Sequence, residues 1–494
     1  MLIHTLLDDA ATDVPDAPAV TDSLGTVTYR VLARWSLAVA HWLRRAGVAP
    51  GERLVVQLPS HRELVAVFHG ASRAGVIFVP LNPAMREFHL ASVLANAEPT
   101  LVISEGEHAA RLRTVTDVPV RELSEIWPEV MELAEQDLAP LPDPAPGDIA
   151  ALIYTSGSTA EPKAVIAPHA QVVFACHALQ QVLGYRPDDV VLCRFPLSWD
   201  YGLYKVLMTC VGRCHVVLVG EESDLTLISR MVQAGATIVP VVPSLASMIV
   251  SLAARRRDLP PVRLFTNTGA ALPASTATAL RRLFPGARVV RQFGQTECKR
   301  VSVMPPEQDL ERPASVGLPL PGTQVLILDA DGAPVPAGQV GEIVVTGPHV
   351  MPGYWRAPEI TARTFRPDGA GGLRLHTGDY GSLDSDGYLY FEGRRDDMFK
   401  RKGIRMSVLE IEAAATDIRG VRAAAVLPPN RDRDLAIVVE GDDLEPYLVL
   451  KHLARRLELA KVPATCTVVA DLPLTQHGKN SREALAALVA QVQR

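Results

Sequence analysis

The chain has 494 residues, of which 48% are hydrophobic and 21% are charged, and its formal net charge is -6. This composition is typical of a soluble globular protein and excludes a disordered chain, and the acidic balance argues against nucleic acid as a main partner. The length exceeds what one hydrophobic core usually holds, so we expect two or more domains.

The N-terminal segment does not resemble a secretory signal, because it has no basic region and carries Asp8 and Asp9 where an apolar stretch should continue. The most apolar window, residues 237–254, is interrupted by two prolines and is a poor candidate for a membrane span. We therefore expect a cytoplasmic enzyme without a membrane partner. Six cysteines without paired C-x-x-C clusters predict reduced, buried thiols, and a metal-binding role for Cys210 and Cys214 is disfavoured.

The first half of the chain alternates helix-like and strand-like segments. Apolar residues at helical spacing predict an amphipathic helix over residues 31–46, and Gly47 follows where a C-terminal cap belongs. Short apolar runs separated by helix-like segments then predict parallel strands with crossover helices. These runs cover residues 53–59, 75–81, 100–104, 237–244, 262–269 and 287–294. Ligands of such sheets bind beyond the carboxyl ends of the strands.

After residue 316 the pattern changes to apolar segments separated by D-G and A-G turns, which predicts a small antiparallel sheet or barrel. Residues 387–403 are strongly charged and are interpreted as an exposed connection. A compact β/α unit of ordinary domain size follows, with a helix over about 446–458. The predicted domains are residues 1–393 and residues 394–494.

The stretch YTSGSTAEPK, residues 154–163, combines four Ser and Thr hydroxyls, one glycine and one lysine. Its composition alone is compatible with a solvated turn. The alternative is a phosphate cradle in which backbone N–H groups and hydroxyls surround an anion and Lys163 adds a charge. The residue order is not that of a Walker loop, which places Ser or Thr after the lysine.

Four further segments decide between these interpretations: RQFGQTECKR at 291–300, LHTGDYGSLDSDGYLYFEGRRDD at 375–397, KRKGIRMSVLEIE at 400–412 and LPLTQHGKNSREAL at 472–485. Together with YTSGSTAEPK they occur in the order and at the spacings of the adenylate-forming superfamily. The chain therefore resembles acyl-CoA synthetases, nonribosomal-peptide adenylation domains and luciferases, from about Tyr29 to Leu485. Any single segment is a weak signal, whereas five in order are a strong one.

The resemblance implies a fold and a reaction. The fold would be α/β, with a large N-terminal domain of parallel-sheet αβα subdomains and a small β-barrel, followed by a small, mobile α+β domain. The enzyme would use ATP and Mg²⁺ to convert a carboxylate to an acyl-AMP and pyrophosphate, and a thiol or amine would then displace AMP. Catalysis would depend on charge neutralisation and in-line positioning.

The resemblance also implies which residues bind the nucleotide. The phosphates would be held by Thr155, Ser156, Gly157, Ser158, Thr159 and Lys163. Glu297 and Thr159 would serve the metal ion, Phe293 would lie against adenine, and Asp379 would bind the ribose with help from Arg394. Taken alone, the TGD sequence around Asp379 favours a simple turn. Further nucleotide contacts are expected from Gly269, Ala270, Gln292, Gly294 and Thr296.

The C-terminal domain would supply the mobile part of the site. Lys479 would reach both the substrate carboxylate and the α-phosphate, although a lone lysine near a C-terminus usually serves solubility. Asp396 matches the hinge of the family, about which the small domain turns after adenylation. Lys400, Gly403 and Ser407 match positions that line the thiol tunnel. Lys402 and Arg405 are also compatible with a plain solvated face.

The chain departs from the family pattern at several positions. Ala160 and Ala164 replace the flanking glycines of the phosphate loop, and alanine would cost about 1 kcal/mol or more where the loop needs positive φ. His376 stands where an arginine is common, and HGKNS replaces the commoner N-G-K-[VI]-D. We expect these changes to affect the rate rather than the class of reaction.

The acyl pocket is the part of the prediction for which the sequence gives the weakest signal. Asp200 aligns with the aspartate that pairs with the substrate ammonium in adenylation domains for amino acids, although a helix N-cap is the alternative. Arg300 is placed to pair with a second substrate carboxylate. The expected lining is Tyr201, Tyr204, Ser244, Thr266, Thr268, Gln292 and Val301. Because polar groups outnumber apolar ones, the lining disfavours a long fatty acid as substrate.

We therefore predict a free-standing enzyme that adenylates a small amino acid and loads it onto the phosphopantetheine of a carrier protein. The candidate substrates include β-amino and acidic amino acids. The alternative is a CoA ligase for a small aryl or alkyl acid. A third reading is a homologue that binds nucleotide or carrier without catalysis, and the two alanines of the phosphate loop motivate it.

Overall fold

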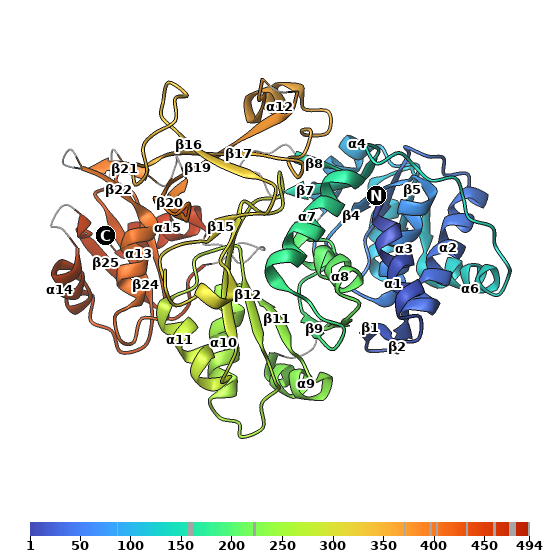
Figure 1. The fold of residues 1–494 in the computed structure, drawn as a ribbon. Helices are drawn as coiled ribbons and strands as arrows, with labels where there is room; N and C mark the ends of the chain where they lie inside the picture. Colours follow the sequence, from blue (N-terminus) through green and yellow to red (C-terminus); the bar gives the residue numbers. More distant parts are fainter. Residues whose placement is uncertain are drawn as a thin grey trace.

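The computed structural model describes residues 1–85, 87–155, 163–220, 224–369, 371–394, 398–401, 404–430, 433–457, 461–473 and 481–492. These residues form an α/β structure with two large sheets, a smaller antiparallel sheet and a C-terminal α+β part (Figure 1).

The first large sheet has six strands in the order β6-β5-β3-β4-β7-β8. Its strands are β3 (Arg53–Val56), β4 (Ile77–Pro80), β5 (Leu101–Ser104), β6 (Val120–Glu122), β7 (Ile149–Thr155) and β8 (Lys163–Pro168). Its helices are α2 (Tyr29–Arg45), α3 (Arg62–Ala74), α4 (Glu87–Ala97), α5 (Gly106–Val115) and α6 (Leu123–Ala134). Leu54 and Val56 face the core that contains α2, α3 and α6, whereas Val55 faces the core that contains α4 and α5. Because neighbouring strand residues point to opposite faces, the apolar run of β3 builds a three-layer αβα unit.

The second large sheet has nine strands in the order β15-β14-β13-β12-β11-β9-β10-β1-β2. Its strands are β1 (Pro18–Asp22), β2 (Gly25–Thr28), β9 (Val190–Cys193), β10 (His215–Leu218), β11 (Ile238–Val241), β12 (Leu264–Asn267), β13 (Arg288–Phe293), β14 (Ser302–Val303) and β15 (Leu318–Pro319). The helices of this part are α1 (Ile3–Asp13), α7 (His169–Leu183), α8 (Asp200–Gly212), α9 (Leu227–Ala234), α10 (Pro243–Ala253) and α11 (Ala274–Leu283). Strands β11, β12 and β13 are parallel, so their carboxyl ends meet at one edge.

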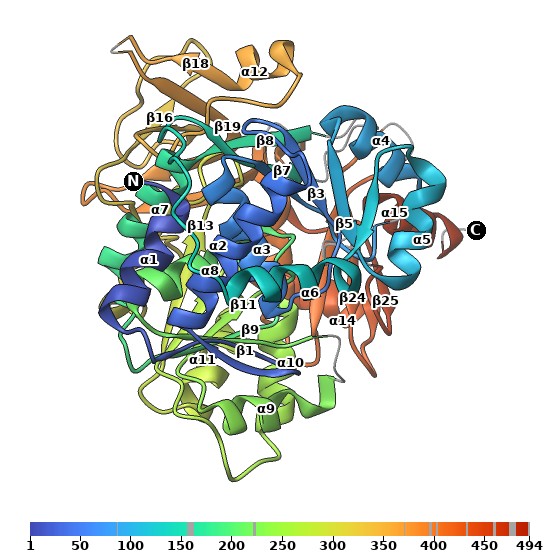
Figure 2. The same cartoon turned by 90° about the vertical axis from the view of Figure 1, so that its right-hand side faces the viewer.

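The smaller sheet is antiparallel and stands where a small sheet or barrel is predicted. It contains β16 (Gln324–Leu328), β17 (Gly341–Thr346), β18 (Phe365–Pro367), β19 (Leu373–Leu383) and β20 (Leu389–Arg394), with α12 (Pro358–Thr364) beside it (Figure 2). The C-terminal part contains β21 (Met398–Arg401), β22 (Ile404–Ser407), α13 (Val408–Thr416), β23 (Ala423–Leu427), β24 (Ala436–Glu440), α14 (Pro446–Arg456), β25 (Thr465–Val469) and α15 (Arg482–Val492). Its buried apolar residues form cores of their own, made only of residues after 407.

The main predicted elements are present. The helix predicted over 31–46 is α2, and Gly47 after it has a positive φ of 81°, as a C-terminal cap requires. The parallel pairing predicted for the early apolar runs is confirmed for β3 with β4 and β5. All six cysteines are free thiols. Among the described residues no helix is both long and apolar enough to cross a membrane.

The prediction of an exposed connection over 387–403 is wrong for its first part. Residues 389–394 form β20, which pairs with β19, and Leu389 is fully buried. Because this segment contains many charged residues, its sequence pattern does not reveal the apolar positions that pack inward. The predicted domain boundary at residues 393 and 394 therefore falls at the end of a strand.

Candidate active site

The phosphate-loop segment is held at both ends by one β-hairpin. Thr155 is the last residue of β7 and Lys163 the first of β8, and these two residues are paired across the antiparallel strands. The Thr155 hydroxyl lies 3.5 Å from the Lys163 carbonyl. Residues 156–162, which include Ser156, Gly157, Ser158, Thr159 and Ala160, lie outside the described part of the chain. The hairpin therefore fixes where the loop starts and ends.

Ala164 does not have the positive φ that its family glycine suggested. It lies in β8 opposite Tyr154, it is fully buried, and it does not belong to the non-glycine residues with positive φ. An extended backbone accepts alanine without strain, so the expected cost does not arise at this position.

Residues 293–301 form a tight turn that carries Glu297. The turn is closed by a 2.9 Å hydrogen bond from the Val301 N–H to the Phe293 carbonyl. A Cβ on Gly294 would lie 2.4 Å from the Lys299 carbonyl oxygen, so only glycine fits there. Thr296 is half-buried in the same turn, whereas Val301 is completely buried.

The Glu297 carboxylate is oriented by a tyrosine that sequence reasoning missed. Tyr354 donates its hydroxyl proton to Glu297 Oε1 at 2.6 Å. Burial and the neighbouring carboxylate raise the pKa of Tyr354, so the phenol stays protonated and acts as the donor. The sequence alone offers no signal for this contact, because 57 positions separate the two residues.

One carboxylate in this place suits magnesium. Mg²⁺ usually keeps several waters and is bound through one or two carboxylates together with substrate phosphates. Among the described residues, no group of three or more His, Cys, Asp or Glu side chains could hold a metal ion without a substrate. Glu297 lies in the turn after β13, and Thr159, the second predicted metal ligand, is outside the described residues.

The predicted ribose residues are neighbours in the small sheet. Asp379 in β19 is paired with Arg394 in β20, and Arg394 Nε donates to Asp379 Oδ1 at 3.2 Å. The Asp379 N–H also donates to the Thr377 hydroxyl at 3.0 Å, at the register shift between β17 and β19. The ring of Phe293 lies 4.8 Å from that of Phe391, so the predicted adenine contact rests on the same sheet.

His376, which departs from the family pattern, has a structural partner. Its Nδ1 lies 3.0 Å from Oε2 of Glu342 on the neighbouring strand β17. Burial raises the pKa of Glu342, but the hydrogen bond from His376 outweighs it and holds the pKa below its usual range. The second carboxylate oxygen accepts from the Gly378 N–H at 3.4 Å, which supports the irregular stretch of β19 before Asp379.

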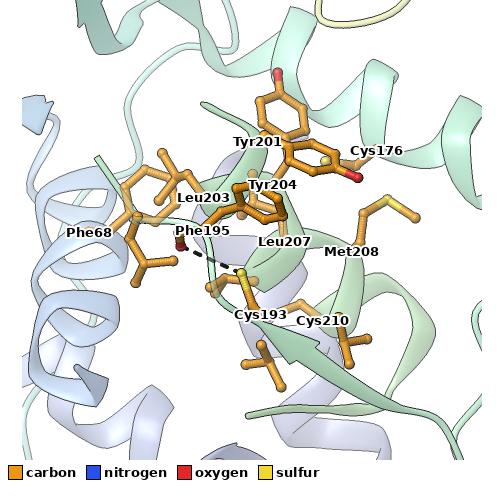
Figure 3. Close-up of a cluster of buried hydrophobic side chains, with 14 of the residues drawn as sticks. Phe68, Cys176, Cys193, Phe195, Tyr201, Leu203, Tyr204, Leu207, Met208 and Cys210 are labelled. Atoms are coloured by element: carbon orange, nitrogen blue, oxygen red, sulfur yellow. Dashed lines mark hydrogen bonds between the residues drawn. The ribbon is translucent and has the colours of Figure 1, made fainter. Parts of the chain in front are cut away.

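Tyr201 and Thr266, which are predicted to line the acyl pocket, are in contact where α8 lies against the carboxyl end of β12. The Tyr201 hydroxyl is 2.7 Å from the Thr266 carbonyl oxygen and 3.0 Å from its hydroxyl. Tyr201 and Tyr204 project from α8 beside Cys176, and the buried cluster continues through apolar side chains (Figure 3). The Tyr204 hydroxyl is buried without a hydrogen-bond partner among the described residues.

Arg300 and Gln292 form a second polar wall. Arg300 Nε donates to Gln292 Oε1 at 2.7 Å, and Arg300 Nη1 donates to the Lys299 carbonyl at 2.7 Å. Both side chains are buried, and Arg300 forms no ion pair with a described carboxylate. A buried guanidinium without a carboxylate favours an anionic ligand.

Asp200 is the first residue of α8 and not its N-cap, which is Trp199. Its partner is Lys299, whose Nζ lies 3.0 Å from Asp200 Oδ2 and 3.0 Å from the Asp200 carbonyl oxygen. Burial raises the pKa of Asp200, but Lys299 and Arg300 outweigh it and hold the pKa below its usual range. Burial lowers the pKa of Lys299 to about 8 despite the nearby Asp200. Sequence reasoning missed Lys299, although its place beside Arg300 was visible.

Three basic side chains lie close to the aromatic rings of α8. Lys205 Nζ lies 4.5 Å from the centroid of the Tyr201 ring, and Arg300 lies 5.2 Å from it. Lys299 lies 4.0 Å from the centroid of the Tyr204 ring. Burial and the neighbouring cations lower the pKa of Lys205 well below its usual range. This buried group therefore carries an excess of positive charge over the one carboxylate of Asp200.

Several predicted residues lie at the margin of this group or outside the described chain. Ser244 is exposed near the start of α10, Gly269 and Ala270 are exposed after β12, and Thr268 is buried. Lys479, Asp396, Gly403 and Lys402 lie outside the described residues. Lys400 and Ser407 stand in the antiparallel pair β21 and β22, and their side chains are not described.

Comparison with known proteins gives this geometry a context. The model of a family described as AMP-binding enzyme matches residues 7–355. Feruloyl-CoA synthase from Amycolatopsis sp is 32% identical, covering 94% of this chain and 94% of that protein. An L-proline–[L-prolyl-carrier protein] ligase from Streptomyces coelicolor is 30% identical, covering 90% of this chain and 88% of that protein.

A solved structure resembles the chain more strongly in sequence. The chain in the crystal structure of VinN is 54% identical to this one, with a TM-score of 0.76. The match covers 80% of this chain and 99% of the VinN chain. VinN is also known in complex with L-aspartate, at 53% identity and a TM-score of 0.75, and in complex with 3-methylaspartate.

Proposed function

The chain belongs to the AMP-binding enzyme family, whose members adenylate carboxylic acids with ATP, and we propose that its substrate is an amino acid with a second carboxylate. In this reaction a substrate carboxylate oxygen attacks the α-phosphorus of ATP, and the bond to pyrophosphate breaks. The products are an acyl-AMP and pyrophosphate. We further propose that a carrier-protein thiol then displaces AMP and receives the acyl group as a thioester.

The observation that carries the substrate class is the buried group of Asp200, Lys299 and Arg300. Its three charges sum to one excess positive charge when all three are ionised. A neutral amino acid would leave that charge without a partner, which is costly in a buried site. An acidic amino acid gives each of the three charged side chains a partner. Its ammonium pairs with Asp200, and its second carboxylate pairs with Lys299 and Arg300. The L-aspartate and 3-methylaspartate complexes of VinN agree with this class of ligand.

The nucleotide roles are proposed on the same geometry. The hairpin ends at Thr155 and Lys163 would place the phosphate loop, and Asp379 with Arg394 would hold the ribose. Glu297 would hold Mg²⁺, which supplies charge neutralisation on the phosphates. The residues of this chain would contribute by fixing the two anions in line, because electrostatic repulsion opposes their approach.

The C-terminal residues complete the proposal. Lys479 would bring a positive charge to the carboxylate and the α-phosphate during adenylation. Residues 394–494 would then turn about Asp396, so that Lys400, Gly403 and Ser407 face the incoming thiol. Replacing Lys479 by alanine should abolish acyl-AMP formation and leave ATP affinity nearly intact. Catalysis unaffected by this change would contradict the assigned role.

The decisive experiment is ATP–pyrophosphate exchange with matched acids. Aspartate and 3-methylaspartate should be activated, with kcat/KM at least about 100-fold above that of asparagine, which lacks only the second charge. Succinate, which lacks the ammonium, should be poor because Asp200 would lose its ligand. Equal activity with asparagine and aspartate would contradict the substrate class.

The acceptor needs its own assay, because the similarity to feruloyl-CoA synthase also favours a CoA ligase. The two candidates are separated by offering CoA and a phosphopantetheinylated carrier protein to the enzyme with its preferred acid. We expect thioester formation on the carrier protein. Exclusive formation of an acyl-CoA would identify the second candidate as correct.

A further inference from the structure

One short segment joins the two predicted halves of the phosphate and metal site. We call residues 351–355 the bridging segment. It bonds to β8, the edge strand that follows the phosphate loop, through the Ala164 carbonyl at 2.8 Å and the Ile166 N–H at 3.0 Å. At its other end the Met351 N–H donates to the Glu297 carbonyl at 3.0 Å. The turn of Glu297 is therefore tied to the hairpin of the phosphate loop.

Tyr354 stands in the middle of the bridging segment with its position fixed from several sides. Its backbone forms an isolated bridge with Val165, and its N–H donates to the Thr361 hydroxyl at 3.0 Å. Its ring is buried and packs edge-on against Phe365, with centroids 5.4 Å apart. The hydroxyl that reaches Glu297 Oε1 is thus carried by a rigid ring on a rigid backbone.

We propose that Tyr354 is a positioning residue that aims the Glu297 carboxylate at the divalent cation of the bound nucleotide. This inference rests on the proposed function. By occupying Oε1, the tyrosine hydroxyl restricts rotation of the carboxylate, and Oε2 accepts no hydrogen bond from the described residues. Mg²⁺ demands near-ideal octahedral geometry, so a carboxylate of fixed orientation binds it better than a rotating one.

The test is Tyr354→Phe, which removes the hydroxyl and keeps the ring against Phe365. ATP binding is measured by calorimetry with and without Mg²⁺, the metal-free arm containing EDTA. Loss of an outer-shell contact typically weakens metal affinity by about 10–100-fold. We therefore expect the Mg²⁺ concentration for half-saturation at fixed ATP to rise at least about tenfold. The affinity for ATP without metal should stay within about twofold of that of the parent enzyme, whereas a purely structural defect would lower it as well.

Tyr390→Phe is a matched control, because the Tyr390 hydroxyl also donates to a carboxylate, Asp384, at 3.2 Å in the same small sheet. This variant should leave the Mg²⁺ dependence unchanged. An unchanged Mg²⁺ dependence in Tyr354→Phe, or an equal change in both ATP arms, would overturn the inference.

A double-mutant cycle separates this inference from the proposed function. Glu297→Gln should raise the Mg²⁺ concentration for half-saturation at fixed ATP. Tyr354→Phe should cause no further rise in that background, because the hydroxyl acts through the carboxylate. If Glu297→Gln has no effect on metal dependence, the proposed role of Glu297 fails. If Glu297→Gln has the expected effect and Tyr354→Phe does not, only the inference about Tyr354 fails.

Discussion

Lys299 donates twice to Asp200, with its Nζ 3.0 Å from the carboxylate and 3.0 Å from the backbone carbonyl at the start of α8. Lys299 is 2% exposed and has a φ of 63°, a conformation that lysine rarely adopts. Residues held in such conformations cluster at ligand sites, where the surrounding structure fixes them. The pair therefore ties the turn of residues 293–301 to the first residue of α8.

Removing one partner of this pair should affect both stability and activity. Asp200→Ala leaves Lys299 buried without a carboxylate, a change that typically costs about 3–5 kcal/mol. We expect a clear fall in Tm and a loss of pyrophosphate exchange with acidic amino acids.

The double variant Asp200→Ala, Lys299→Met provides the control for this prediction. It removes both charges, so Tm should recover towards the parent value while exchange activity stays low. Recovery of activity together with stability would show that the pair serves the fold alone.

The pKa of Lys299, lowered by burial to about 8, predicts a pH dependence of substrate capture. Lys299 is protonated below this value and loses its charge above it, so its attraction for a second carboxylate fades as pH rises. We expect kcat/KM for an acidic amino acid to decline above pH about 8, since kcat/KM reports the groups of the free enzyme.

Lys299→Arg is the companion variant for the pH profile. Arginine keeps its charge at all accessible pH values, so the decline near pH 8 should disappear even if the overall rate falls. A decline that persists unchanged in Lys299→Arg would assign the titration to another group.

The sequence predicts the architecture better than it predicts the pocket. Apolar runs such as residues 53–59 define β3 because burial on both faces needs a continuous apolar stretch. Lys299 could not be assigned from sequence, because its burial depends on a positive-φ turn and on Asp200, which is 99 positions away. Strand β20 was missed because the charged run that starts at Glu392 obscures the buried Leu389 and Gly393. Long-range contacts and an adjoining charged run thus limit the sequence-based prediction at these two places.

Ala164 offers a direct test of the family pattern. Because Ala164 is buried in extended β8, Ala164→Gly should lower the free energy of unfolding by about 0.5–1 kcal/mol without raising activity. The measurements are chemical denaturation and pyrophosphate exchange. A marked gain in activity would indicate that the loop needs glycine flexibility at this position after all.

Glu412 gives the C-terminal part a predicted pH dependence of stability. Burial raises the pKa of Glu412 to about 7, while its Oε1 accepts the Val426 N–H at 2.8 Å. The folded form therefore holds a proton that the unfolded chain releases near pH about 4.3. The protonated carboxyl stabilises the fold fully below that value, and this contribution is lost as pH rises through about 7.

Glu412→Gln should remove this dependence, because the amide oxygen accepts the same hydrogen bond without a charge. We expect the variant to raise Tm at pH 8, by about 2–4 °C for each kcal/mol recovered, and to change it little at pH 5. Glu410, which is exposed on the same helix and pairs with Lys461, provides the control. Glu410→Gln should lack the gain at pH 8, since an exposed carboxylate keeps its charge in both states. An equal gain in the two variants would point to a general effect of net charge rather than to the buried carboxyl.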